Sequence, residues 1–115
     1  MSNSLGDMTP LGAVLQRLAA TIDVRAESGA DKSYTAQLLA KGPDKIAAKI
    51  IEEGGELAEA LLNESDTAVA SEAADVLYHI LVGLRARGIR LEDVANILAA
   101  REGTSGLEEK ASRSS

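Results

Sequence analysis

Apolar residues recur at helical spacing along most of this 115-residue chain. They form one stripe over residues 9–28 and cover a wide arc of the longest run, residues 43–63. Further helical runs span residues 34–41, 66–87 and 91–101. No segment alternates apolar and polar residues with the period of two that is typical of a half-buried strand. The pattern therefore predicts an all-α fold of about five helices.

Residues that start and stop helices stand between these runs. Ser, Thr and Asp cap the first turn with a side-chain oxygen, Pro fits the first helical position, and Gly fits the position after the last turn. The expected starts are Thr9–Pro10, Ser33, Pro43 and Asp66 or Thr67, and the expected stops are Gly42, Gly88 and Gly103. These signals agree with the helices that the apolar spacing predicts.

The corners between the helices are short, which favours an antiparallel helical bundle. The two long helices are apolar over more of their circumference than a small monomer can bury, so we expect a homodimer to complete the bundle. In the last helix we expect four residues to face inward: Leu91, Val94, Ile97 and Leu98. We expect an N-terminal segment over residues 1–8, one helical domain over residues 9–102, and a polar tail over residues 103–115 that could cover a substrate.

Composition narrows the class of protein. The chain has no Phe, Trp or Cys, so small aliphatic side chains must form its core, which favours closely packed helices. A net charge of −6 argues against binding to nucleic acid or to an anionic membrane. The absence of Cys fits a reducing compartment, and no signal peptide or transmembrane run is recognisable. We therefore expect a cytoplasmic protein without nucleic-acid or membrane partners.

Two acidic pairs stand within the two long apolar helices. Glu53 and Glu56 lie three residues apart, as do Glu72 and Asp75, so each pair shares one helix face, and Glu52 borders the first pair. In an antiparallel hairpin the pairs face each other at similar height. Carboxylate oxygens gathered between apolar helices would select a hard cation, Mg²⁺ or alternatively Mn²⁺. The pattern alone leaves a solvated acidic face as the competing interpretation.

Three further features of these helices allow two interpretations each. Lys45 and Lys49 could form ion pairs on their own helix or contact a phosphate group. His79 is more typical of a hydrogen-bonded core or interface residue, and it lacks the Glu-x-x-His spacing of a di-iron site. Gly54–Gly55 costs about 1 kcal/mol per residue in a helix interior. We expect the two glycines to allow close approach of a neighbouring helix.

Three segments carry a resemblance to a known family: SYTAQLLAKGPDKIAAKIIEEGGE, EAADVLYHILVGLRARGIRLEDV and REGTSGLEEKASR. Together they resemble the phosphoribosyl-ATP pyrophosphatases, a branch of the all-α NTP pyrophosphatase (MazG-like) superfamily. The two acidic pairs mark only the superfamily. The Ser-Tyr segment, the Asp-x-x-Tyr-His step and the EKASR ending are narrower, and the resemblance covers nearly the whole chain.

The resemblance implies hydrolysis of 1-(5-phosphoribosyl)-ATP to 1-(5-phosphoribosyl)-AMP and pyrophosphate, the second step of histidine biosynthesis, by a Mg²⁺-dependent homodimer. It also assigns roles to individual residues. The implied metal ligands are Glu53, Glu56, Glu72 and Asp75, with Glu52 as a further candidate. Glu52 or Glu53 would orient or deprotonate the attacking water. The implied phosphate contacts are Lys41, Lys45, Lys49, Lys110 and Arg113.

Two alternatives remain at this stage. A house-cleaning pyrophosphatase that acts on deoxynucleoside or non-standard triphosphates would use the same carboxylates, but it has no role for the EKASR ending. A non-catalytic helical interaction module would present an acidic face without a metal. The sequence leaves open the number of metal ions, and whether one subunit's tail covers its own site or its partner's.

Overall fold

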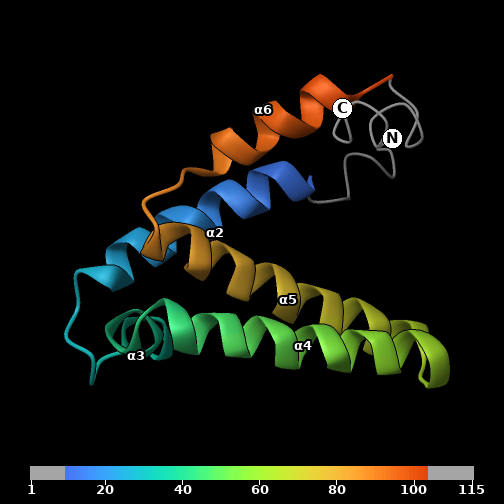
Figure 1. Cartoon of the computed structure of the whole chain (residues 1–115), viewed down its shortest axis with the longest axis horizontal. Helices are drawn as coiled ribbons and strands as arrows, with labels where there is room; N and C mark the ends of the chain where they lie inside the picture. Colours follow the sequence, from blue (N-terminus) through green and yellow to red (C-terminus); the bar gives the residue numbers. More distant parts are fainter. Residues whose placement is uncertain (1–9, 104–115) are drawn as a thin grey trace.

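The computed structural model describes residues 10–103, and within this range the chain is helical with no strand (Figure 1). Five helices follow one another in these residues: α2 (Leu11–Ala26), α3 (Tyr34–Lys41), α4 (Pro43–Asn63), α5 (Asp66–Ala86) and α6 (Leu91–Arg101). The predicted all-α class is confirmed for this range, and the bounds of α3, α4 and α6 agree with those predicted.

Most start and stop residues act as expected. Pro10 is still extended and precedes α2 rather than forming its first helical residue, and Thr9 lies outside the described residues. The Ser33 side chain accepts a hydrogen bond from the Ala36 amide at 3.0 Å and caps α3. Gly42 has a φ of +93° and Gly88 a φ of +70°, values that favour glycine, where α3 and α5 end. The predicted cap of α5 is wrong by one residue. Its first turn is capped by Ser65 rather than by Asp66 or Thr67, because Ser65 is still extended and Asp66 is already helical.

Helices α4 and α5 form a long antiparallel hairpin, and α3 packs across its open end (Figure 1). The core joins one or two residues from each of four helices: Ile22, Leu38, Ile46, Leu81 and Val82. Burial of each such side chain contributes about 1.5–3 kcal/mol. At Gly83 the hairpin is tight, because a Cβ atom there would lie 3.4 Å from Ile46 Cγ2. This contact fixes how α4 and α5 lie against each other.

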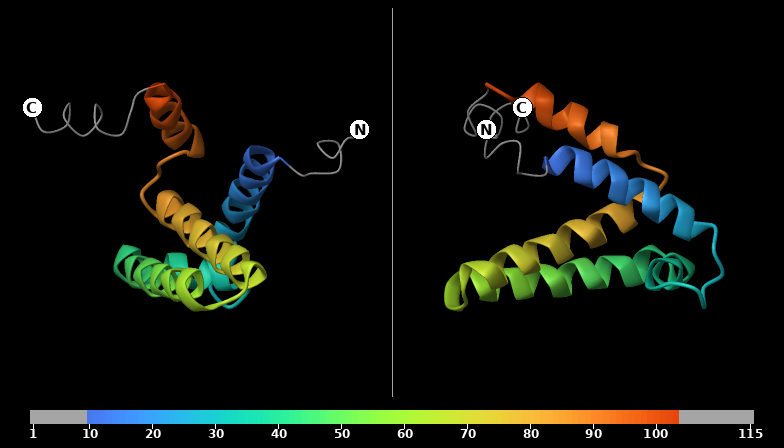
Figure 2. Two further views of the ribbon diagram at one scale, coloured as in Figure 1. Left: turned by 90° about the vertical axis from the view of Figure 1, so that its right-hand side faces the viewer. Right: turned by 180° about the vertical axis from the view of Figure 1, so that it is seen from behind.

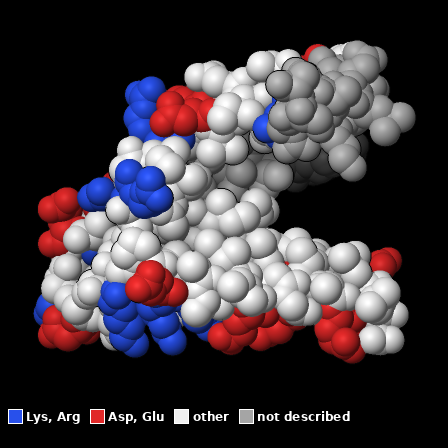
Figure 3. Space-filling model, in the orientation of Figure 1, with Lys and Arg blue, Asp and Glu red and all other residues white. Residues whose placement is uncertain are grey.

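Helices α2 and α6 lie beyond the hairpin as two separate arms (Figure 2). Together with α5 they border a hollow of about 890 Å³, which we call the α2–α6 groove. Its lining is mainly apolar and includes Leu15, Ala19, Ile80, Leu84, Leu91 and Leu98. The surface between the arms and the hairpin is correspondingly almost free of charge (Figure 3). None of the predicted site residues within residues 10–103 lines this groove.

Helix α6 does not pack as predicted. Leu91 reaches the core and Val94 is half-buried, but Ile97 and Leu98 are 55% and 58% exposed. The inward prediction for Ile97 and Leu98 is therefore wrong within the single chain. Leu98 lines the α2–α6 groove, which no helix of the described residues fills, whereas Ile97 lies outside the groove's lining and faces solvent.

Among the described helices, α5 is long and apolar enough to cross a membrane by length and composition. Core helices of water-soluble domains pass the same test. Here α5 packs along α4 and carries Glu72 and Asp75 in its middle.

Candidate active site

The α4–α5 hairpin brings the two acidic pairs together. One carboxylate oxygen each from Glu53, Glu72 and Asp75 lie within 4.8 Å of one another. The same holds for Glu52, Glu53 and Glu56. Glu53 belongs to both groups, so it links the α4 carboxylates to those of α5. We call these five residues the acidic cluster.

Burial makes this cluster unlike a solvated acidic face. Glu53 is only 7% exposed, although its neighbours on α4 are largely open to solvent. The Oε1 atom of Glu72 is buried and has no hydrogen-bond partner. That burial, followed by the negative charges of Glu56 and Asp75, raises the pKa of Glu72 above its usual value. Water thus solvates Glu53 and one oxygen of Glu72 poorly, whereas Glu52, Glu56 and Asp75 are exposed.

The donor set fits a hard divalent cation. It consists of carboxylate oxygens only, and Mg²⁺ and Mn²⁺ are the cations that such a set favours. The orphaned oxygen of Glu72 and the repulsion around it are features that a bound cation would relieve. The residues present therefore fit the metal that the sequence predicts, and their role as ligands stays a prediction.

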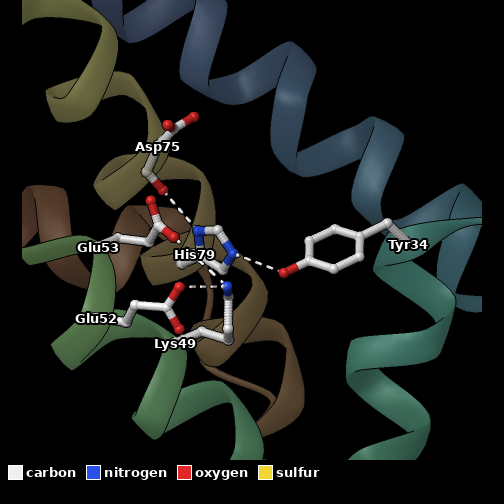
Figure 4. A network of polar contacts seen from close by, with 6 residues as sticks. All are labelled: Tyr34, Lys49, Glu52, Glu53, Asp75 and His79. Atoms are coloured by element: carbon white, nitrogen blue, oxygen red, sulfur yellow. Dashed lines mark hydrogen bonds and ion pairs between the residues drawn. The ribbon is translucent and has the colours of Figure 1, made fainter. Parts of the chain in front are cut away.

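Lys49 lies against the cluster from one turn earlier on α4. Its Nζ atom is 3.2 Å from Glu52 Oε2 and 3.5 Å from Glu53 Oε2 (Figure 4). The hydrogen bond to Glu52 is the main cause that raises the pKa of Lys49. The ammonium is therefore a fixed positive charge beside two carboxylates, and a phosphate contact remains a prediction for it.

The other predicted phosphate contacts lie apart from these ion pairs. Lys41 and Lys45 are exposed and form no ion pair within residues 10–103. Lys45 stands one turn before Lys49 on the same face of α4. Lys110 and Arg113 lie outside the described residues.

A second polar group, which the sequence did not reveal, borders the cluster on the α3 side. Tyr34 Oη lies 3.2 Å from His79 Nε2, and His79 Nδ1 lies 2.7 Å from the backbone oxygen of Asp75 (Figure 4). Next to it Thr35 Oγ1 forms a short hydrogen bond with the Tyr78 hydroxyl, and the Tyr34 and Tyr78 rings stack at 6.3 Å. The expectation that His79 is a hydrogen-bonded core residue is confirmed, since it is 5% exposed.

The interpretation of Gly54–Gly55 as a site of close packing is wrong for the single chain. A Cβ atom at either glycine would meet nothing within 4 Å. Gly83 on α5 is the position where α4 and α5 approach closely. The two glycines lie on the cluster's helix without a neighbour in residues 10–103.

Known proteins of one family match this chain over most of its length. The family model of phosphoribosyl-ATP pyrophosphohydrolase matches residues 15–102. A phosphoribosyl-ATP pyrophosphatase of Cereibacter sphaeroides is 53% identical over 100 residues, which are 87% of this chain and 97% of the relative. Phosphoribosyl-ATP pyrophosphatase 1 of Rhodopseudomonas palustris is 52% identical over 99 residues, 86% of this chain and 92% of its own. The enzyme of the same name from Paracoccus denitrificans matches to the same extent.

These matches span both acidic pairs of the hairpin, and they join its geometry to the family whose motifs the chain resembles. The chain belongs to the phosphoribosyl-ATP pyrophosphohydrolase family.

Proposed function

We propose that this protein hydrolyses 1-(5-phosphoribosyl)-ATP to 1-(5-phosphoribosyl)-AMP and pyrophosphate, in the second step of histidine biosynthesis. The observation that carries the proposal is the acidic cluster, in which α4 and α5 gather four carboxylates around that of the buried Glu53, in a chain of this family. Water attacks the α-phosphorus, the bond from that phosphorus to the bridging oxygen breaks, and pyrophosphate leaves.

Glu53, Glu56, Glu72 and Asp75, with Glu52 at the edge, are the residues that would hold Mg²⁺, or Mn²⁺ in its place. When bound, such an ion supplies positive charge between the carboxylates and the substrate's phosphates. The chain's own contribution is a set of oxygens that the hairpin holds in place before the substrate arrives.

The attacking water needs a carboxylate that can orient it and accept its proton. Glu52 and Glu53 are the candidates, and they differ in their surroundings. Glu53 is buried and shared by both groups of the cluster, which suits a ligand. Glu52 is exposed and belongs to one group only. Glu52 is therefore better placed to face water, with Lys49 fixing its orientation.

Positive side chains beside the cluster would bind the phosphates and stabilise the leaving pyrophosphate. Lys49 is already at the cluster's edge, and Lys45 follows on the same face of α4. Lys41, in the last turn of α3, would provide a further phosphate contact. Lys110 and Arg113 would contact the substrate's ribose-linked phosphate.

The protein would act as a homodimer in the cytoplasm, without nucleic-acid or membrane partners. Support for the dimer comes from the apolar α2–α6 groove and from the half-exposed Ile97 and Leu98 at α6. A second copy would complete the antiparallel bundle there. Support for the absence of anionic partners comes from the net charge of −6.

The test is pyrophosphate release by the purified protein with Mg²⁺, comparing phosphoribosyl-ATP with deoxynucleoside triphosphates. Glu53→Gln and Asp75→Asn should each lose about 100-fold or more of kcat/KM, because even residues that merely support metal ligands are worth about 10–100-fold. Glu59→Gln is the matched control. It lies on α4 outside the cluster, where its carboxylate binds only Asn63 in the described residues.

Equal pyrophosphate release by the wild type, Glu53→Gln and Asp75→Asn would exclude catalysis by the cluster. Faster turnover of deoxynucleoside triphosphates than of phosphoribosyl-ATP would make the protein a house-cleaning pyrophosphatase instead.

A further inference from the structure

Two side-chain hydrogen bonds join α3 to α5, and they lie in different surroundings. Thr35 is 1% exposed, and its bond to Tyr78 lies within the packed helices. Tyr34, by contrast, is 48% exposed and bonds to His79 at the edge of the acidic cluster. A bond that only fastened α3 to α5 would not need this exposed position.

The two partners of His79 determine where its proton lies. A backbone carbonyl oxygen can only accept, so the contact between Nδ1 and the Asp75 oxygen places the proton on Nδ1. Nε2 of the neutral ring then carries a lone pair, and the Tyr34 hydroxyl must donate to it. The Tyr34 proton is therefore directed away from the cluster, and the oxygen keeps lone pairs that can accept.

The side chain of Lys49 ends in the same region as that oxygen (Figure 4). The Lys49 Nζ atom and the Tyr34 hydroxyl point toward the same space beside His79, from α4 and α3 respectively (Figure 4). The hydrogen bond to Glu52, and after it the nearby Tyr34, raise the pKa of Lys49. A hydroxyl whose proton is engaged in the hydrogen bond to His79 cannot donate to a phosphate, but its oxygen can accept a hydrogen bond from an ammonium.

We propose that Tyr34 and His79 are positioning residues that hold the Lys49 ammonium at the edge of the acidic cluster, turned toward the substrate's phosphates. This inference rests on the proposed phosphate contact of Lys49. Lys49 has a flexible four-carbon stem and two carboxylates within 3.5 Å, so without a third partner it would turn fully onto Glu52 and Glu53. His79 acts at a distance, by fixing which way the Tyr34 hydroxyl donates.

Tyr34→Phe tests this directly, because it removes the hydroxyl and keeps the ring that stacks on Tyr78. We expect kcat/KM to fall about ten-fold, the size of one hydrogen bond to a charged group. In a Lys49→Met background the same change should have an effect of less than about two-fold, because the two residues then no longer couple. An undiminished effect in that background would overturn the proposal, as would full activity of Tyr34→Phe.

Two further variants separate positioning from folding. Thr35→Val removes the neighbouring α3–α5 hydrogen bond and should leave kcat/KM within about two-fold while lowering the melting temperature. His79→Leu should match Tyr34→Phe, and His79→Gln should recover most of the loss, since its amide oxygen offers an acceptor near the place of Nε2. Equal losses in Thr35→Val and Tyr34→Phe would show that only the α3–α5 contact matters.

Binding of inorganic pyrophosphate in the presence of Mg²⁺, measured by calorimetry, gives a second readout without turnover. Tyr34→Phe should weaken it about ten-fold and Thr35→Val should not. If pyrophosphate affinity follows this order among the variants but the wild type does not hydrolyse phosphoribosyl-ATP, the proposed function is contradicted and the positioning of Lys49 still holds. If the wild type hydrolyses the substrate but Tyr34→Phe and Thr35→Val bind pyrophosphate equally well, only the positioning of Lys49 is contradicted.

Discussion

The acidic hairpin and the α2–α6 groove are opposite kinds of surface on one small chain. The hairpin packs carboxylates together, including an oxygen of Glu72 that has no partner. The groove leaves apolar side chains such as Leu98 in contact with solvent. Each arrangement costs free energy in the isolated chain, the first through repulsion and desolvation and the second through exposed apolar area. Under the proposed function each cost would be relieved by a different partner, a cation for the hairpin and another apolar surface for the groove.

In the proposed function the acidic hairpin would serve catalysis and the α2–α6 groove would serve assembly. Groups of like charge held close together, with shifted pKa values, are typical of functional sites. Apolar area left open beside charged arms is typical of an interface. The following changes test whether the two surfaces really have separate partners, beginning with the largest effect.

Glu72→Gln should have opposite effects on activity and stability. Activity should fall about 100-fold or more, because a ligand is lost where even supporting residues are worth about 10–100-fold. Without divalent cation the melting temperature at neutral pH should rise, because the change removes a poorly solvated charge from beside Glu56 and Asp75. Pyrophosphate release with Mg²⁺ measures the activity, and calorimetry with EDTA and with Mg²⁺ measures the melting temperature. A lower melting temperature in EDTA would mean that the Glu72 carboxylate stabilises the hairpin by itself.

Leu98→Lys should weaken association through the α2–α6 groove and leave the acidic cluster of the hairpin unchanged. Leu98 is 58% exposed in the single chain, yet a dimer through the groove would bury it, and a charge there should weaken association by about 2 kcal/mol or more. Leu62→Lys is the matched control, since Leu62 is 80% exposed on α4 and lies outside the groove. Sedimentation velocity across a concentration series measures the change. Unaltered association in Leu98→Lys would place the interface elsewhere.

The pH dependence of stability should report the hairpin's charge. In the folded state, burial and the charge of Glu56 raise the pKa of Glu72 above its ordinary value of 4.5, so the folded protein holds this proton to higher pH than the unfolded chain does. The stability that the protonated form contributes is fully present below 4.5 and is lost as the pH rises through the raised value. In urea unfolding with EDTA, the free energy of unfolding of the wild type should therefore decrease relative to that of Glu72→Gln as the pH increases. A constant difference between the two would exclude this linkage.

The sequence predicted the helices well because their signals are local. Apolar spacing, Ser33, Gly42 and Gly88 act within a few residues of the helix ends they define. The acidic pairs could also be matched in advance, because a short corner fixes the register of the α4–α5 hairpin. Their function still required the family resemblance, since repeated carboxylates alone fit a solvated face equally well.

The contacts that sequence reasoning missed join distant residues on different helices. Tyr34 and His79 are 45 positions apart, and no spacing rule connects α3 to α5. The direction of α6 was missed for another reason. Its apolar residues were recognised, but Ile97 and Leu98 find no surface to cover within residues 10–103. A pattern shows that a face is apolar, and it does not show which surface will cover it.

Gly54→Ala and Gly55→Ala give the smallest effect and the finest test of the two surfaces. Both glycines lie in the interior of α4, and an added Cβ atom meets nothing within 4 Å. Each substitution should therefore stabilise the protein by about 1 kcal/mol, the difference in helix propensity between Gly and Ala. Urea unfolding measures the gain, and sedimentation velocity at the same concentrations measures association. If either alanine instead destabilised the protein and weakened the dimer, a partner subunit would approach α4 at these glycines. The hairpin would then share its interface with the groove, and the separation of catalysis from assembly would not hold.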